Sequence, residues 1–133
     1  MLEHVAIWTK NLEELKDFYC SYFGGEAGGK FTCDIPGFPE FESYFISFGD
    51  GSRLELMKKA GLPDSAYEPG GEAVGLTHLA FSAKEPTEVD ELTARAREEG
   101  RTIVTEPYRT LDGYYESCIL DPDGNRVEIT VSL

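Results

Sequence analysis

The sequence predicts an α+β fold made of two copies of one module, each with the order strand, helix and three strands. The first observation is a repeat: the only two histidines, His4 and His78, are 74 positions apart, and Glu55 and Glu128 are 73 apart. The second is that all four residues lie in short apolar stretches typical of strands. The third is a helical segment that ends at glycine in each half. We expect the two modules to share one sheet.

The first half begins with a strand around His4 to Trp8. Asn11, with a glutamate three residues later, predicts an N-cap and a helix that runs to about Phe23 and stops at Gly24. Three further strands are expected around Phe31 to Cys33, Tyr44 to Phe48 and Arg53 to Met57, the last two joined at Gly49-Asp50-Gly51.

The second half repeats this order. A strand around His78 precedes a helix that Thr87 is expected to cap and that runs to Gly100. Strands are expected at Thr102 to Glu106, Tyr114 to Leu120 and Asn125 to Val131, with a turn at Asp121-Pro122-Asp123-Gly124. We therefore expect a single domain over 1–133, with module one at about 1–58, a linker or mobile flap at about 59–75, and module two at about 76–133.

The four repeated residues are expected on one side of the sheet. Side chains alternate along a strand, so the apolar neighbours of His4, Glu55, His78 and Glu128 fall on the buried face and these four on the other. Imidazole nitrogens and carboxylate oxygens are ligands for divalent metals. The pattern therefore indicates a metal site.

Composition narrows the function classes. A net charge of −13 argues against a nucleic-acid partner, because phosphate binding needs clustered Lys and Arg. We expect no membrane partner, because no apolar run approaches the roughly 20 residues of a spanning helix, and no signal peptide. Three cysteines without C-x-x-C spacing argue against a disulfide framework and favour a reducing cytoplasm.

The motifs together resemble the vicinal oxygen chelate superfamily, which includes glyoxalase I, epimerases, extradiol dioxygenases and drug resistance proteins. The resemblance rests on His4-Val5-Ala6-Ile7, the segment Asn11 to Tyr19, Arg53-Leu54-Glu55-Leu56, Gly75 to Phe81, and Asp121 to Ile129. It implies a curved, partly open, barrel-like mixed sheet with a cleft. The set His, Glu, His, Glu is similar to that of glyoxalase I, whereas members resembling epimerases tend to carry Gln at the position of Glu55.

The resemblance implies a metal-dependent lyase or isomerase that acts on a hemithioacetal or a small hydroxy-carbonyl compound through an enediolate. His4, Glu55, His78 and Glu128 would be the metal ligands, and Glu55 and Glu128 would carry the proton. Nickel or zinc is the expected metal, with cobalt, manganese or iron as other options. The expected partners are a small-molecule substrate, including a thiol adduct, and a second copy of the chain in a homodimer, with sites formed within or across chains.

Several alternatives stay open. Each histidine could be a hydrogen-bonded strand residue, and the two glutamates could simply pair with Arg53 and Arg126. The protein could be another enzyme of the superfamily, such as an epimerase or an extradiol dioxygenase, or a metal-free protein that binds a drug or metabolite. Large side chains that could line the cleft or merely pack are Trp8, Met57 and Tyr115. The segment from Tyr108 to Tyr115 could be a closing loop or an ordinary hairpin connection.

Overall fold

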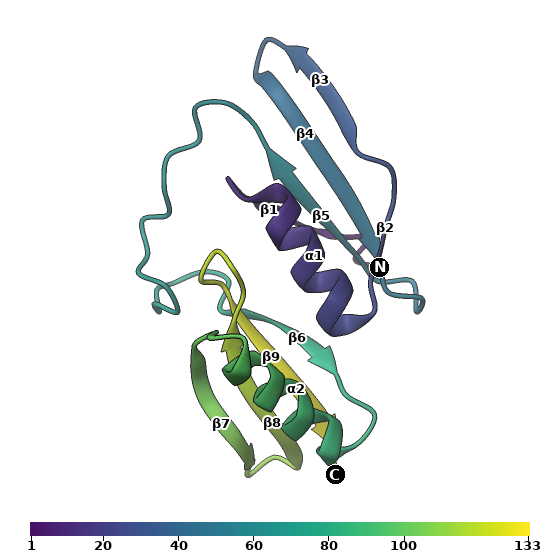
Figure 1. Ribbon diagram of the computed structural model, residues 1–133, viewed down its shortest axis with the longest axis vertical. Helices are drawn as coiled ribbons and strands as arrows, with labels where there is room; N and C mark the ends of the chain where they lie inside the picture. Colours follow the sequence, from purple (N-terminus) through teal and green to yellow (C-terminus); the bar gives the residue numbers. More distant parts are fainter. The chain divides into compact units, whose positions relative to one another are not determined.

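The chain folds into two compact units, Met1–Asp64 and Ser65–Leu133, each with one helix and one sheet (Figure 1). This computed structural model describes all 133 residues. The α+β fold with two modules is confirmed. The single sheet shared by both modules is not observed: the first strand of each module pairs with the last strand of the same module, so two sheets form and neither is a closed barrel.

In the first unit, strand β4 is the element on which the sheet is built. Its elements are β1 (Val5–Trp8), α1 (Leu12–Phe23), β2 (Glu26–Ala27), β3 (Phe31–Ile35), β4 (Phe38–Ser47) and β5 (Arg53–Lys58). The order is β1-β5-β4-β2, and β3 also pairs with β4, so β2 and β3 follow the same edge in succession. Strand β4 begins six residues before the expected Tyr44, because its first half forms the hairpin with β3.

The second unit has the same topology, except that one strand, β7, takes the place of β2 and β3 at the sheet edge. Its elements are β6 (His78–Ser82), α2 (Pro86–Glu98), β7 (Ile103–Arg109), β8 (Tyr114–Leu120) and β9 (Arg126–Ser132), and the sheet order is β6-β9-β8-β7. In both units the first and last strands are parallel and the remaining long pairs are antiparallel. Neither helix is long and apolar enough to cross a membrane.

Each helix covers one face of its own sheet and forms the core there (Figure 1). Leu15 and Tyr19 of α1 are fully buried, as are Ile46 and Leu56 of the sheet beneath. In the second unit, the buried Thr93 hydroxyl lies 2.7 Å from the Ser117 hydroxyl and donates to a helix carbonyl, which satisfies the polar groups within the core. The opposite face of each sheet carries no helix of its own unit. We call it the open face.

The helix boundaries agree with the prediction, but the expected caps do not form. Asn11 makes no side-chain capping hydrogen bond, and α2 begins at Pro86 with Glu85 as its N-cap instead of Thr87. Proline suits the first helical position because its ring fixes φ and the missing N–H would have no partner there. Gly24 ends α1 in the left-handed region at φ 66°, as the glycine signal predicts.

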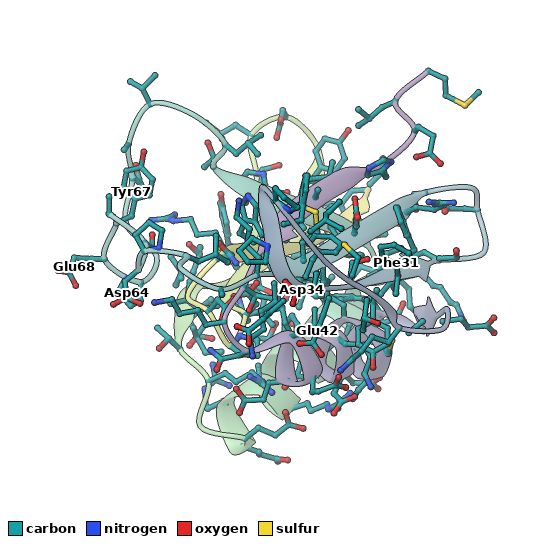
Figure 2. The ribbon with its side chains drawn as sticks, turned by 90° about the horizontal axis from the view of Figure 1, so that it is seen from above. Phe31, Asp34, Glu42, Asp64, Tyr67 and Glu68 are labelled. Carbon is teal, nitrogen blue, oxygen red and sulfur yellow. The ribbon has the colours of Figure 1, made fainter.

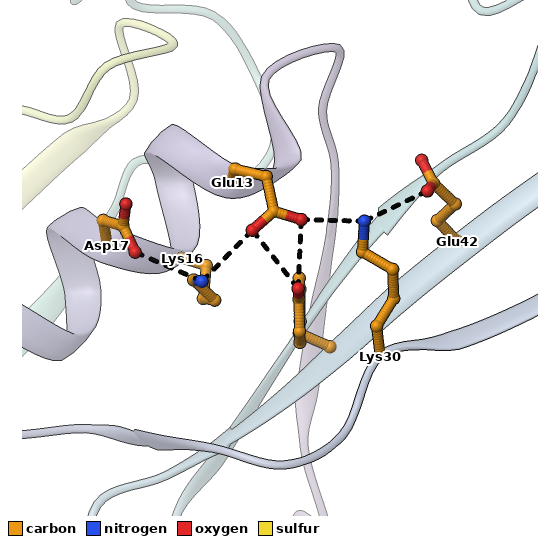
Figure 3. Close-up of polar contacts among 6 residues, drawn as sticks. Glu13, Lys16, Asp17, Lys30 and Glu42 are labelled. Atoms are coloured by element: carbon orange, nitrogen blue, oxygen red, sulfur yellow. Dashed lines mark hydrogen bonds and ion pairs between the residues drawn. The ribbon is translucent and has the colours of Figure 1, made fainter.

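A charged cluster fastens α1 to the first sheet (Figure 3). The Glu13 carboxylate lies 2.8 Å from the Lys30 ammonium and 3.1 Å from that of Lys16, and the Tyr44 hydroxyl donates to it at 3.0 Å. Lys30 also pairs with Glu42. One helix carboxylate thus connects the helix to both β4 and the segment before β3.

The linker is irregular but its second half is held in place. Tyr67 and Glu68, labelled in Figure 2, lie on it, and no strand or helix forms between β5 and β6. Within the second unit, the Arg126 guanidinium donates to the carbonyl of Gly70 at 2.8 Å and to the Glu72 carboxylate at 2.8 Å. The linker is therefore attached to the start of β9.

Candidate metal and substrate site

The His-Glu repeat of the sequence is also a repeat of sheet register. His4 immediately precedes β1, and Glu55 on the neighbouring β5 lies opposite Ala6. His78 begins β6, and Glu128 on β9 lies opposite Ala80. In both units a histidine and a glutamate thus occupy equivalent positions on two parallel neighbouring strands, with alanine as the facing residue.

The two side chains of each pair approach each other on the open face. His4 Nε2 lies 3.3 Å from Glu55 Oε2, and His78 Nε2 lies 3.4 Å from Glu128 Oε2. Two ligands each about 2.1 Å from one ion are about 3.0 Å apart at an octahedral angle and about 3.4 Å apart at a tetrahedral angle. Each pair therefore has the spacing of two ligands on one metal ion. No group of three or more potential ligand residues forms in the structure.

His4 is oriented by its surroundings. Its Nδ1 contacts the Glu3 carboxylate, and its ring meets Phe45 edge-on at 5.2 Å. The contact with His4 lowers the pKa of Glu3, so this carboxyl stays ionised at neutral pH. A carboxylate on the second imidazole nitrogen fixes the tautomer that leaves Nε2 free to act as a ligand. The sequence offers no equivalent at His78, which follows Thr77.

The arginines beside the two glutamates are engaged elsewhere. Arg53 lies over the Phe45 ring and 3.4 Å from Glu3, and Arg126 pairs with Glu72 of the linker. The alternative in which Arg53 and Arg126 are the ion-pair partners of Glu55 and Glu128 is therefore wrong. Neighbouring positions in sequence indicated that alternative, but the guanidinium groups contact Phe45, Glu3 and Glu72 instead.

The second unit adds a carboxylate that the sequence analysis missed. Glu116 on β8 shares the open face with Glu128, accepts a hydrogen bond from Thr130 at 3.3 Å and another from Tyr108 at 3.4 Å. Burial raises the pKa of Glu128, His78 opposes the rise, and the nearby Glu116 adds to it. Strand alternation alone could not have placed Glu116 beside Glu128, because the two lie on different strands. The structure supplies the register, in which Cys118, two residues from Glu116, is opposite Glu128.

The three expected pocket residues do not share one face. Trp8 follows His4 by four positions and Met57 follows Glu55 by two, so both lie on the open face of the first unit. Tyr115 lies on the helix side of the second sheet, where its hydroxyl donates to Asp90 of α2 at 2.6 Å. The second sheet therefore separates Tyr115 from the His78–Glu128 pair.

The segment from Tyr108 to Tyr115 is an ordinary hairpin connection. Strands β7 and β8 continue to Arg109 and from Tyr114, and the Thr110 hydroxyl accepts a hydrogen bond from the Tyr114 amide at 2.9 Å. Gly113 supplies the positive φ of the turn. This segment has the geometry of a tight turn, and the closing-loop alternative has no support in it.

Comparisons with known proteins agree with this architecture. A family model described as Glyoxalase/Bleomycin resistance protein/Dioxygenase superfamily matches residues 1–129. Uncharacterized protein YqjT of Bacillus subtilis (strain 168) is 26% identical in an alignment of 133 positions that covers 96% of each chain. The structure of a glyoxylase/bleomycin resistance protein/dioxygenase domain from Frankia sp. EAN1pec has a TM-score of 0.80 at 17% identity and covers 100% of this chain and 98% of that one. Lactoylglutathione lyase from Agrobacterium tumefaciens has a TM-score of 0.64 at 27% identity, covering 98% and 92%.

Proposed function

The chain belongs to the Glyoxalase/Bleomycin resistance protein/Dioxygenase superfamily, and from this we propose that it is a metal-dependent lyase or isomerase similar to glyoxalase I. The proposed substrate is a hemithioacetal or another small hydroxy-carbonyl compound. The observation that carries the proposal is the pair of histidine–glutamate contacts, at 3.3 and 3.4 Å, in equivalent register in the two units. Similarity to the lactoylglutathione lyase of Agrobacterium tumefaciens supports the reaction class.

The donor set fits a divalent cation of the nickel or zinc kind. We propose that His4, Glu55, His78 and Glu128 hold it together, each unit contributing the two ligands that already lie at ligand spacing. When bound, the ion would stabilise the negative charge that develops on adjacent substrate oxygens. The His4 ring is held for this role by the Glu3 carboxylate.

Glu128 is the proposed proton carrier. Burial raises its pKa, which makes this carboxylate a better proton acceptor than an exposed glutamate. Glu116, fixed by Tyr108 and Thr130, maintains that basicity through its charge. Glu55 is the second candidate, because it occupies the equivalent position in the first unit.

Elemental analysis of untagged protein tests the metal. We expect about one nickel, zinc, cobalt, manganese or iron per site in the wild-type protein, and loss of that metal in His78→Ala and His4→Ala. Glu42→Gln is the control, since Glu42 lies on β4 and pairs with Lys30, not with a histidine. Absence of metal after reconstitution would contradict the enzyme proposal and point to metal-free binding of a small molecule.

Activity is tested with methylglyoxal hemithioacetals of several thiols. Glu128→Gln should lower kcat by about 10²-fold or more if this carboxylate moves the proton. We also propose a homodimer. Mixing His4→Ala with His78→Ala chains separates two arrangements: sites shared between chains would regain one intact site per mixed dimer, and sites within one chain would regain none.

A further inference from the structure

A cluster of aromatic rings occupies the open face of the first unit, further along the strands from the His4–Glu55 pair. We call Trp8, Phe31, Phe38 and Phe41 the aromatic wall. The rings of Trp8, Phe31 and Phe38 lie 6.3, 6.1 and 5.5 Å from that of Phe41. Phe41 is only 8% exposed, whereas Trp8, Phe31 and Phe38 are 42%, 58% and 45% exposed (Phe31 is labelled in Figure 2). A cluster of exposed apolar side chains is a candidate binding surface.

One cation lies within the aromatic wall. The Lys59 ammonium is 4.9 Å from the centre of the Trp8 ring and 5.7 Å from that of Phe38, and it donates to the Gly37 carbonyl at 3.4 Å. It forms no ion pair, although the chain carries 25 carboxylate side chains against 12 Lys and Arg. Aromatic faces hold an ammonium without neutralising it. Its charge therefore remains available to an anionic group seated on the wall.

The fold does not require a large apolar side chain at the position of Trp8. In the repeat, Trp8 and Met57 of the first unit correspond to Ser82 and Thr130 of the second, which pair in the same register. The same backbone is therefore formed with small polar residues at these positions. Trp8 follows His4 by four residues on one face, roughly 13 Å along the strand. The wall thus extends the surface on which the proposed metal pair lies.

We propose that the aromatic wall and Lys59 bind the substrate's body, and that this body is an organic anion: an aromatic or aliphatic group seated on the rings, with a carboxylate directed at Lys59. That the bound anion is a substrate rests on the proposed function, whereas the binding of the anion to this surface does not. The wall supplies apolar contact and aromatic stacking, and Lys59 supplies selectivity for a negative charge in a chain whose overall charge repels anions.

Trp8 reports on this surface directly, because it is the only tryptophan of the chain. The probe is phenylbutyrate, compared with its uncharged analogue phenylbutanamide, titrated into full-length protein freed of metal with a chelator. We expect Trp8 fluorescence to respond to both and phenylbutyrate to bind about fivefold more tightly, which corresponds to about 1 kcal/mol for a partly exposed ion pair. Lys59→Gln should remove this preference. Lys58→Gln changes the preceding residue, which ends β5 on the same side as the buried Leu54 and Leu56, and should keep the preference.

Equal affinity for the two probes, or an unchanged preference in Lys59→Gln, would overturn the proposal. So would a Trp8 response that follows protein concentration and disappears with dimer dissociation in Phe31→Ser, because the wall would then be covered by a second copy. The metal-free protein keeps the result separate from catalysis. Binding with the carboxylate preference but without turnover would support the aromatic wall and contradict only the lyase proposal. Turnover without the carboxylate preference would support the lyase proposal and contradict only the role of the aromatic wall and Lys59.

Discussion

Replacing Glu13 by glutamine removes the charge that connects α1 to the first sheet. In the folded protein, hydrogen bonds from Lys30 and Lys16 lower the pKa of Glu13 from 4.5 to about 2 (Figure 3). If all of that difference were stability, it would amount to roughly 3 kcal/mol at neutral pH. The side chain is 54% exposed, so solvent screening reduces the expected value to about 1 kcal/mol.

The sign follows from the direction of the shift. Because the folded pKa is lowered, the ionised Glu13 stabilises the protein above about pH 4.5, and this contribution is lost as the pH falls toward about 2. Urea unfolding of wild type and Glu13→Gln should therefore differ by about 1 kcal/mol at pH 7 and converge in acid. Glu14→Gln, one residue along α1, is the control. A difference that stays constant between pH 7 and pH 3 would refute the electrostatic argument.

Three further predictions concern the site and the linker. Glu3→Gln should weaken metal binding about tenfold, because His4 loses the carboxylate that orients it; competition with a chelator measures this, and unchanged affinity would remove Glu3 from the site. Gly124 has a φ of +86°, and the Cβ of Gly124→Ala would lie 2.9 Å from a linker proline. The substitution should therefore lower the free energy of unfolding by more than the roughly 1–2 kcal/mol of backbone strain expected for Gly113→Ala, whose Cβ meets nothing. Equal losses of the two variants in urea unfolding would contradict the clash. Arg126→Lys should expose the linker to limited proteolysis, because a single ammonium cannot reproduce both guanidinium contacts; wild-type cleavage rates would show that these contacts do not hold it.

The two faces of each sheet were predictable from sequence, and the partners on the open face were not. Strand alternation placed His4 and Glu55 on one side because side-chain period is a local property of an extended chain. Alternation says nothing about which strand lies alongside, so it could not show that Arg53 pairs with Glu3 or that Tyr115 reaches Asp90. Both contacts join side chains of different elements, so they depend on how those elements pack in the folded chain.

The sequence by itself determined the α+β class, the two-module repeat, the glycine helix stops and the recurrence of one histidine and one glutamate in each half, since each is encoded by spacing along the chain. Only the tertiary structure decided that the strands form two separate sheets, because the choice of pairing partner for each strand depends on all the other strands and is not encoded in any one segment. It alone brought the aromatic wall around Lys59, since ring contacts between β1, β3 and β4 require these strands to share one sheet, with β5 between β1 and β4. It also showed that Glu116 lies near Glu128. Burial and the charge of Glu116, both properties of the folded state, raise the pKa of Glu128.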